Sequence, residues 1–123
     1  MGRGQREDLK ITFKQSPAVN VRFTAHALSD LDTARRWYEG RSPGLETYFD
    51  DDVEYAVGCI IRQPFIWPIL TNSRQNEDIR LITLEKFPYM LVYRLDVDDS
   101  VMVLAVPHLH QRPGRWIRRL KDK

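Results

Sequence analysis

Residues 79–107 carry the sequence IRLITLEKFPYMLVYRLDVDDSVMVLAVP, in which three apolar runs alternate with two short polar breaks. The runs cover residues 79–84, 90–97 and 101–107. The breaks are Lys86-Phe87-Pro88 and Asp98-Asp99-Ser100. Runs of this length and composition are typical of strands, and such short breaks favour antiparallel turns. The second and third runs are almost wholly apolar, which predicts central strands that are covered on both faces.

A strand and a helix are predicted upstream of this segment. Residues 19–23 alternate between apolar and polar side chains, as half-buried strands do. Thr24 can cap the helix that follows, and Gly40 supplies its stop signal. The apolar stripe of this helix consists of Leu28, Leu31, Ala34 and Tyr38. Its steps of three and four residues match the helical period.

A second helix is predicted to begin at Ser42-Pro43, as a cap followed by proline at the first helical position. Its apolar stripe is Leu45, Phe49, Val53, Ala56 and Ile60. It should end near Pro64, because the residue before a proline avoids the helical conformation. The gap between the helices is short, which predicts a helical hairpin.

The remaining segments are a loop and two ends. Residues 63–78 predict a long ordered loop, and loops of this length in compact domains are often functional. Pro113 should start a last helix over residues 114–120. Residues 1–18 are expected to be an extension, within which residues 9–13 could form an edge strand. The prediction is thus an α+β fold in the order β-α-α-β-β-β-α, with a single domain over residues 19–123.

Composition narrows the cellular setting. No apolar run reaches the roughly 18–20 residues that span a bilayer, and the first eight residues lack the apolar core of a secretory signal. Cys59 is the only cysteine, so an intramolecular disulfide is excluded and a cytoplasmic location is expected. Cys59 is interpreted as a packed structural thiol, because its neighbours in the sequence include no base.

The net charge of +2 hides a strong asymmetry along the chain. Residues 28–55 hold eight acids and three arginines, a balance of −5. Residues 108–123 hold six bases and one acid, a balance of +5. Such separation concerns partners rather than fold, and the basic end predicts an anionic partner.

Short motifs follow one another in order along the second half of the chain. They are Arg80, Phe87-Pro88-Tyr89, Tyr93, Ala105-Val106-Pro107-His108, Arg112-Pro113 and Trp116. With the order of elements over residues 20–120, they resemble the RelE/ParE toxins of bacterial type II toxin–antitoxin modules, also called plasmid stabilisation proteins. The resemblance implies a twisted, largely antiparallel sheet with the helical hairpin on one face.

The resemblance also implies partners. Toxins of this family are neutralised by a cognate antitoxin whose disordered tail folds over them. RelE-like members cut messenger RNA on the ribosome, whereas ParE-like members bind DNA gyrase without known catalysis. A homo-oligomer or a heterotetramer with the antitoxin would fit such a module. RelE-like enzymes use several lysines, but no lysine lies between Arg62 and Arg80 here. The Phe-Pro-Tyr motif and the spacing from His108 to Arg112-Pro113 are closer to the ParE side.

A minimal ribonuclease site can still be assembled from three residues. Cleavage of RNA without a metal needs an acid–base group and a cation beside the phosphoryl oxygens. His108 and His110 share one face of an extended segment and could supply the first, while Arg80 could supply the second. The alternative is that Arg80 forms a salt bridge with Glu54 or Glu85, and that the ring of His108 packs or bonds to backbone.

Other residues are expected to bind the antitoxin or the target. They are Tyr89, Arg94, Arg112, Arg115, Trp116 and Arg119. Trp116 could instead anchor the core. The histidines have no cysteine or carboxylate at ligand spacing, so no metal and no cofactor are predicted. Three hypotheses follow: a ParE-like toxin that acts by binding, a RelE-like ribonuclease, and a non-toxic orphan member of the fold.

Overall fold

The computed structural model describes residues 20–70 and 78–110, except positions 97 and 99. Its elements are β2 (Val21–Phe23), α1 (Ala25–Arg41), α2 (Leu45–Arg62), β3 (Asp78–Thr83), β4 (Met90–Leu95) and β5 (Val101–Ala105). The strands form one sheet in the order β2-β5-β4-β3. β2 pairs with β5 in parallel, and the other two pairings are antiparallel. The α+β class and the two central strands are therefore confirmed.

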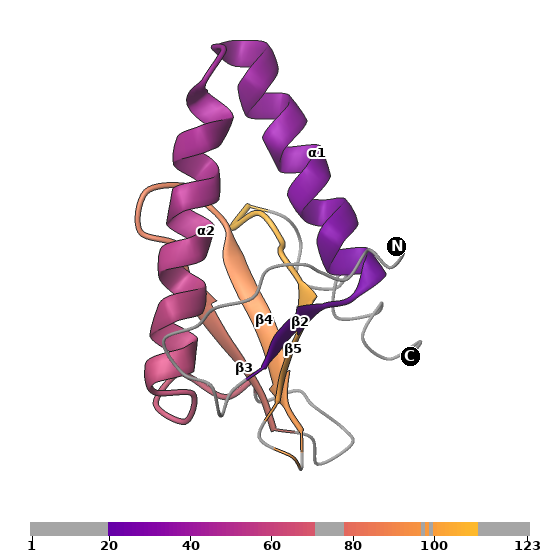
Figure 1. Cartoon of the computed structure of the whole chain (residues 1–123), viewed down its shortest axis with the longest axis vertical. Coiled ribbons are helices and arrows are strands. Elements are labelled where there is room, and N and C mark those ends of the chain that lie inside the picture. The colour runs from indigo at the N-terminus through magenta and orange to yellow at the C-terminus, as the bar shows by residue number, and fades with distance from the viewer. Residues whose placement is uncertain (1–19, 71–77, 97, 99, 111–123) are drawn as a thin grey trace.

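Both helices cover the same face of the sheet, as Figure 1 shows. The main core lies between the helices and the sheet. It buries Phe49, Val57 and Ile60 of α2 against Leu91, Tyr93 and Val103 of the sheet. A second, smaller cluster lies on the other face and includes Ile79, Val92 and Leu104. The members of this second cluster all come from the strands or from residues next to them. The predicted helical hairpin on one face of the sheet is thus confirmed.

Thr24 caps α1 as predicted. Its hydroxyl oxygen accepts a hydrogen bond from the Ala27 N–H at 3.1 Å, and its hydroxyl donates to the Leu104 carbonyl at 3.2 Å. The same side chain therefore starts the helix and ties it to the strand next to β2. The start of α1 is thus fixed to the sheet by Thr24, a residue that the sequence already identifies as a helix cap.

The boundary between the helices differs from the prediction. α1 continues through Gly40 to Arg41, and the Ser42 N–H still donates to the Tyr38 carbonyl as a helix end does. The cap of α2 is not Ser42-Pro43 but Gly44, at a φ of 95° that glycine adopts without strain. The chain reverses there because Gly44 has no Cβ. The stop and start signals were therefore assigned to the wrong residues of this linker.

The other bounds are close to those predicted. α2 ends at Arg62, two residues before Pro64. β4 and β5 are each two residues shorter than their apolar runs, and the turn between them is closed by the Asp96 N–H donating to the Ser100 carbonyl. No helix in the described part of the chain is both long and apolar enough to cross a membrane. The predicted edge strand at residues 9–13 and the helix at 114–120 lie outside the described residues.

Candidate functional site

The two predicted histidines lie together at one end of the sheet. His108 follows β5 and forms a bridge with Tyr89, just before β4. Its ring meets the Tyr89 ring edge-on with centroids 4.9 Å apart, and the centroid of the His110 ring lies 5.1 Å from that of His108. The His110 N–H donates to His108 Nδ1 at 3.0 Å. The predicted packing of the His108 ring and its bond to backbone are both present.

An aromatic cluster supports this end of the sheet from the helix side. Tyr89 and Phe87 contact Tyr38 of α1 and Phe49 of α2, with ring centroids between 4.8 and 6.2 Å apart. Phe49 is fully buried. Edge-on aromatic pairs add stabilisation beyond their buried area. The histidine pair is therefore joined to the buried aromatic cluster through Tyr89, with His110 exposed to solvent.

Burial raises the pKa of Tyr89 to about 12, and the neighbouring Tyr38 adds to the shift. Because the folded-state pKa is above the ordinary value of 10.0, the neutral phenol stabilises the fold fully below pH 10. This contribution is lost as the pH rises towards 12. We expect urea denaturation to show stability falling over this range, and falling less steeply in Tyr89→Phe. An identical decline in the variant would contradict the assignment.

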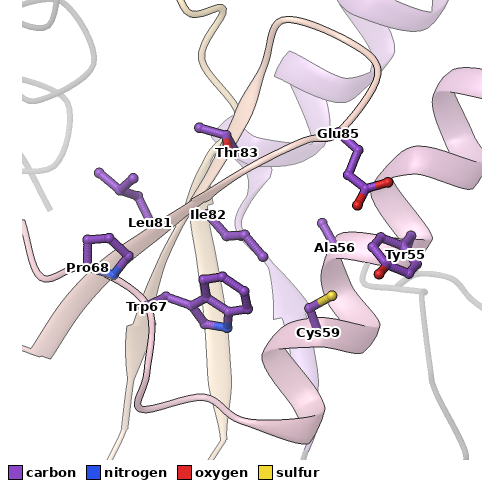
Figure 2. Close-up of a pocket in the computed structure, with 9 residues that line it drawn as sticks. All are labelled: Tyr55, Ala56, Cys59, Trp67, Pro68, Leu81, Ile82, Thr83 and Glu85. Carbon is purple, nitrogen blue, oxygen red and sulfur yellow. The ribbon is translucent and has the colours of Figure 1, made fainter.

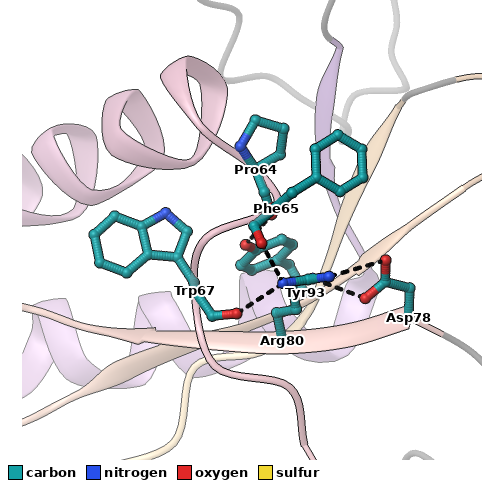
Figure 3. A network of polar contacts seen from close by, with 6 residues as sticks. All are labelled: Pro64, Phe65, Trp67, Asp78, Arg80 and Tyr93. Atoms are coloured by element: carbon teal, nitrogen blue, oxygen red, sulfur yellow. Dashed lines mark hydrogen bonds and ion pairs between the residues drawn. The ribbon is translucent and has the colours of Figure 1, made fainter.

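Arg80 is committed to structural hydrogen bonds, which Figure 3 draws as dashed lines. Its Nε donates to Asp78 at 2.8 Å, and its Nη1 donates to the carbonyls of Phe65 and Trp67 at 2.6 and 3.0 Å. Only 12% of the side chain is exposed. The Tyr93 hydroxyl donates to the Pro64 carbonyl at 2.7 Å. These two side chains of neighbouring strands thus hold residues 64–67 against the sheet.

The expected salt bridge of Arg80 exists, but its partner is Asp78 rather than Glu54 or Glu85. Asp78 lies two residues earlier on β3, so both side chains project from the same face of the strand. Glu85 lies beyond the end of β3, and Glu54 is an exposed residue of α2. The alternation of side chains along β3 therefore explains why Asp78, rather than either glutamate, is the ion-pair partner of Arg80.

The structure does not bring Arg80 to the histidines. Arg80 pairs across the sheet with Tyr93 of β4, whereas His108 pairs with Tyr89, which lies four residues earlier and just before β4. Four residues correspond to about 13 Å along a strand. The two histidines are therefore grouped and the arginine is separate. Within the described ranges, no group of three or more metal-ligating side chains is present.

The other predicted binding residues divide into two sets. Tyr89 belongs to the aromatic cluster, and Arg94 of β4 forms an ion pair with Asp96, just after the strand, at 2.8 Å. Arg112, Arg115, Trp116 and Arg119 lie outside the described residues. The described chain nevertheless leads directly from the histidine pair into this basic segment, because His110 is its last residue.

Sequence reasoning missed a cavity of about 400 Å³ between α2 and the outer edge of β3. Figure 2 shows Tyr55 and Cys59 of α2 facing Trp67 and Ile82 across it. The indole N–H of Trp67 is buried and finds no hydrogen-bond partner among the described residues. The exposed aromatic positions of α2 and the proline-rich 63–70 segment were the available signals, and neither reveals a cavity before the elements are packed.

Comparison with known proteins gives one family and two similar structures. The model of the family described as ParE toxin of type II toxin-antitoxin system, parDE, matches residues 21–113. A chain of the chromosomal ParDE toxin–antitoxin system from P. aeruginosa is similar with a TM-score of 0.63 and 17% identity, over 76% of this chain and 98% of that chain. The isolated E. coli RelE toxin is similar with a TM-score of 0.53 and 17% identity, over 82% of this chain and 97% of that one. No curated protein matches this sequence significantly. At these identities the two structures establish the fold.

Proposed function

This chain belongs to the ParE toxin family of type II toxin–antitoxin systems, and from that premise we propose that it inhibits a cellular protein by binding it. DNA gyrase is the proposed target, and a cognate antitoxin neutralises the toxin. The setting proposed for both interactions is the bacterial cytoplasm. The competing hypothesis is a RelE-like ribonuclease that acts on messenger RNA at the ribosome.

The state of Arg80 is the observation that carries this proposal. A ribonuclease needs a cation that can reach the phosphoryl oxygens as charge develops on them. The guanidinium of Arg80 is instead bonded to Asp78, Phe65 and Trp67, and is nearly buried. It is also separated from His108 along the strand. Recruiting Arg80 for catalysis would require breaking the contacts that hold residues 64–67.

The proposed binding surface is the histidine end of the sheet together with the basic segment that follows it. His110 and Leu109 are exposed there, and the Leu109 N–H donates to the Pro88 carbonyl at 2.8 Å. Residues 108–123 carry a balance of +5. A partner segment with acidic and apolar side chains is complementary to this surface. Disordered antitoxin tails have that chemistry and bury large surfaces when they fold on binding.

One observation favours the ribonuclease as a second candidate. His108 and His110 lie in ring contact at the edge of the aromatic cluster, and an imidazole is suited to acid–base work near neutral pH. The basic segment that begins at Arg112 could then replace Arg80 as the cation. The two candidates differ in what happens to messenger RNA, so they are separable by direct assay.

We expect the purified chain to inhibit supercoiling by gyrase while messenger RNA in cell-free translation stays intact. The double variant His108→Ala/His110→Ala should change inhibition by no more than about tenfold, because it removes contacts rather than a reacting group. Loss of an acid–base group would instead lower cleavage by roughly 10²–10⁴. Cleaved messenger RNA, with that large loss in the double variant, would establish the ribonuclease.

The antitoxin is tested separately by co-expression with the product of the neighbouring gene. A ligand that binds only the folded state raises the melting temperature by mass action. We expect co-purification and a higher melting temperature than for the chain alone. A chain that is harmless in cells, inhibits neither process and gains nothing from the neighbour would support the orphan hypothesis instead.

A further inference from the structure

The outer edge of β3 is only partly covered in the described part of the chain. Residues 68–70 pair with its first half, because the Leu70 N–H donates to the Ile79 carbonyl at 2.8 Å and the Leu81 N–H donates to the Pro68 carbonyl at 3.1 Å. Odd-numbered residues of β3 thus direct their backbone groups away from β4. The next such groups are the Leu81 carbonyl and the Thr83 N–H. No hydrogen bond from the described residues reaches either of them.

The cavity of about 400 Å³ adjoins this part of the β3 edge. Leu81 and Thr83 line one side of it, while Tyr55 and Cys59 of α2 line the other (Figure 2). Pro68 and Trp67 close the end where the covering segment stops. A volume of this size suits one large side chain or a small ligand. Among the described residues, backbone groups without a hydrogen bond and an apolar cavity therefore occur at one place.

The rim of the cavity is acidic. Glu85 lines it, and Asp51 is an exposed residue of α2. Asp51 and Tyr55 are four residues apart and so lie on one face of the helix. Arg62 is the basic residue of this end of α2, and its Nη2 donates to Cys59 Sγ at 3.4 Å. The acidic side chains outnumber the basic one, so the surface favours a cationic partner.

We propose that an extended segment of a protein partner adds to β3 at Leu81–Thr83 and places one large apolar side chain in the cavity. Lysine or arginine two residues before and after that side chain would face the carboxylates, because alternate residues of a strand project to the same side. Pairing with a free sheet edge supplies affinity, and the cavity supplies specificity. This surface uses none of the residues of the basic surface of the proposed function. Its partner has the opposite charge, so neither proposal depends on the other.

The first experiment uses two model peptides, acetyl-Lys-Val-Phe-Val-Lys-amide and its counterpart with glutamate at both ends. Titration into the full chain is followed by NMR at the Thr83 amide and the Trp67 indole. We expect the cationic peptide to shift both signals and the acidic peptide to bind at least roughly tenfold more weakly. Equal binding of both peptides, or no shift with the cationic peptide at millimolar concentration, overturns the proposal. Equally tight binding of free phenol or indole also overturns it, in favour of a small-molecule cavity.

Variants then test the strand pairing and the cavity. Thr83→Pro removes the outward N–H without removing a bond to β4, a substitution that edge strands accommodate. We expect Thr83→Pro to lower the affinity for the cationic peptide by roughly tenfold, while Thr83→Val changes that affinity by no more than about twofold. Tyr55→Ala should weaken binding, whereas Tyr48→Ala should not, because Tyr48 is another exposed tyrosine of α2 but lies outside the cavity. Matching effects within either pair overturn the proposal.

A backbone-methylated peptide keeps the pairing testable if Thr83→Pro fails to fold. Methylation of the amides that face β3 removes the donors and blocks the approach of the strand, while the side chains and charges remain. Loss of binding supports strand addition, and unchanged binding overturns it. Sedimentation of the full chain tests whether the chain self-associates. Self-association that Tyr55→Ala abolishes would assign this edge to a second copy and overturn the partner proposed here.

Discussion

Replacing Asp52 with alanine lowers the free energy of unfolding by about 3–5 kcal/mol, the expected result of removing one partner of a buried charged network. Asp52 lies on α2 and is 5% exposed. Its carboxylate accepts three hydrogen bonds from consecutive backbone N–H groups of the β3–β4 turn, those of Glu85, Lys86 and Phe87 at 3.3, 2.8 and 3.0 Å. Alanine leaves all three donors without their acceptor. The turn that carries Phe87 towards the aromatic cluster then loses its anchor.

Asparagine at the same position should give an intermediate loss. Its single side-chain oxygen can take the place of the oxygen that accepts from Lys86 and Phe87, while its NH₂ group meets only the longer contact to Glu85. Asp51→Asn is the matched control, because Asp51 is exposed on the same helix and should change stability by less than about 0.5 kcal/mol. Urea denaturation of Asp52→Ala, Asp52→Asn and Asp51→Asn measures their free energies of unfolding, which should increase in that order. Equal stabilities for Asp52→Asn and Asp51→Asn would show that the turn does not depend on the carboxylate.

Arg80→Met lowers the free energy of unfolding by about 2–4 kcal/mol, because hydrogen bonds that involve a charged group contribute about 1.5–3 kcal/mol each and several are lost together. Methionine keeps the apolar stem but gives up the bonds to Asp78 and to the Phe65 and Trp67 carbonyls. The 64–67 segment is then held mainly by Tyr93. Amide hydrogen exchange should accelerate at Leu70 and Leu81, whose N–H groups join this segment to β3.

Arg36→Met is the control for Arg80. The side chain of Arg36 is 78% exposed and forms an ion pair with Asp32 one helical turn away, which contributes little at a surface. A loss for Arg80→Met no larger than for Arg36→Met would mean that the buried clamp is not structural. The comparison also bears on toxicity assays. A toxin that loses activity on removal of Arg80 has lost part of its fold, so that loss alone does not identify a catalytic residue.

Local patterns were sufficient for most of the elements. The alternation before Thr24, the three- and four-residue steps of the helices and the apolar runs after residue 78 predicted six described elements in their observed order. The almost wholly apolar runs also predicted that β4 and β5 would be central. These features are encoded by residues a few positions apart, whose spacing decides which face of a helix or strand is buried. The linker at Gly44 was misassigned because two local signals, a cap followed by proline and a glycine, competed within three residues.

The chemistry of the site required the tertiary structure. Three charged residues have different roles because of what packs against them. Asp52 meets backbone donors 33 to 35 positions away, Arg80 meets carbonyls 13 and 15 positions away, and Asp51 meets solvent. The sequence by itself determined which residues are apolar, which are charged and how each segment folds locally. Only the packed fold decided which charges are buried and bonded, because a hydrogen bond depends on the distance between two groups in space rather than on their separation along the chain.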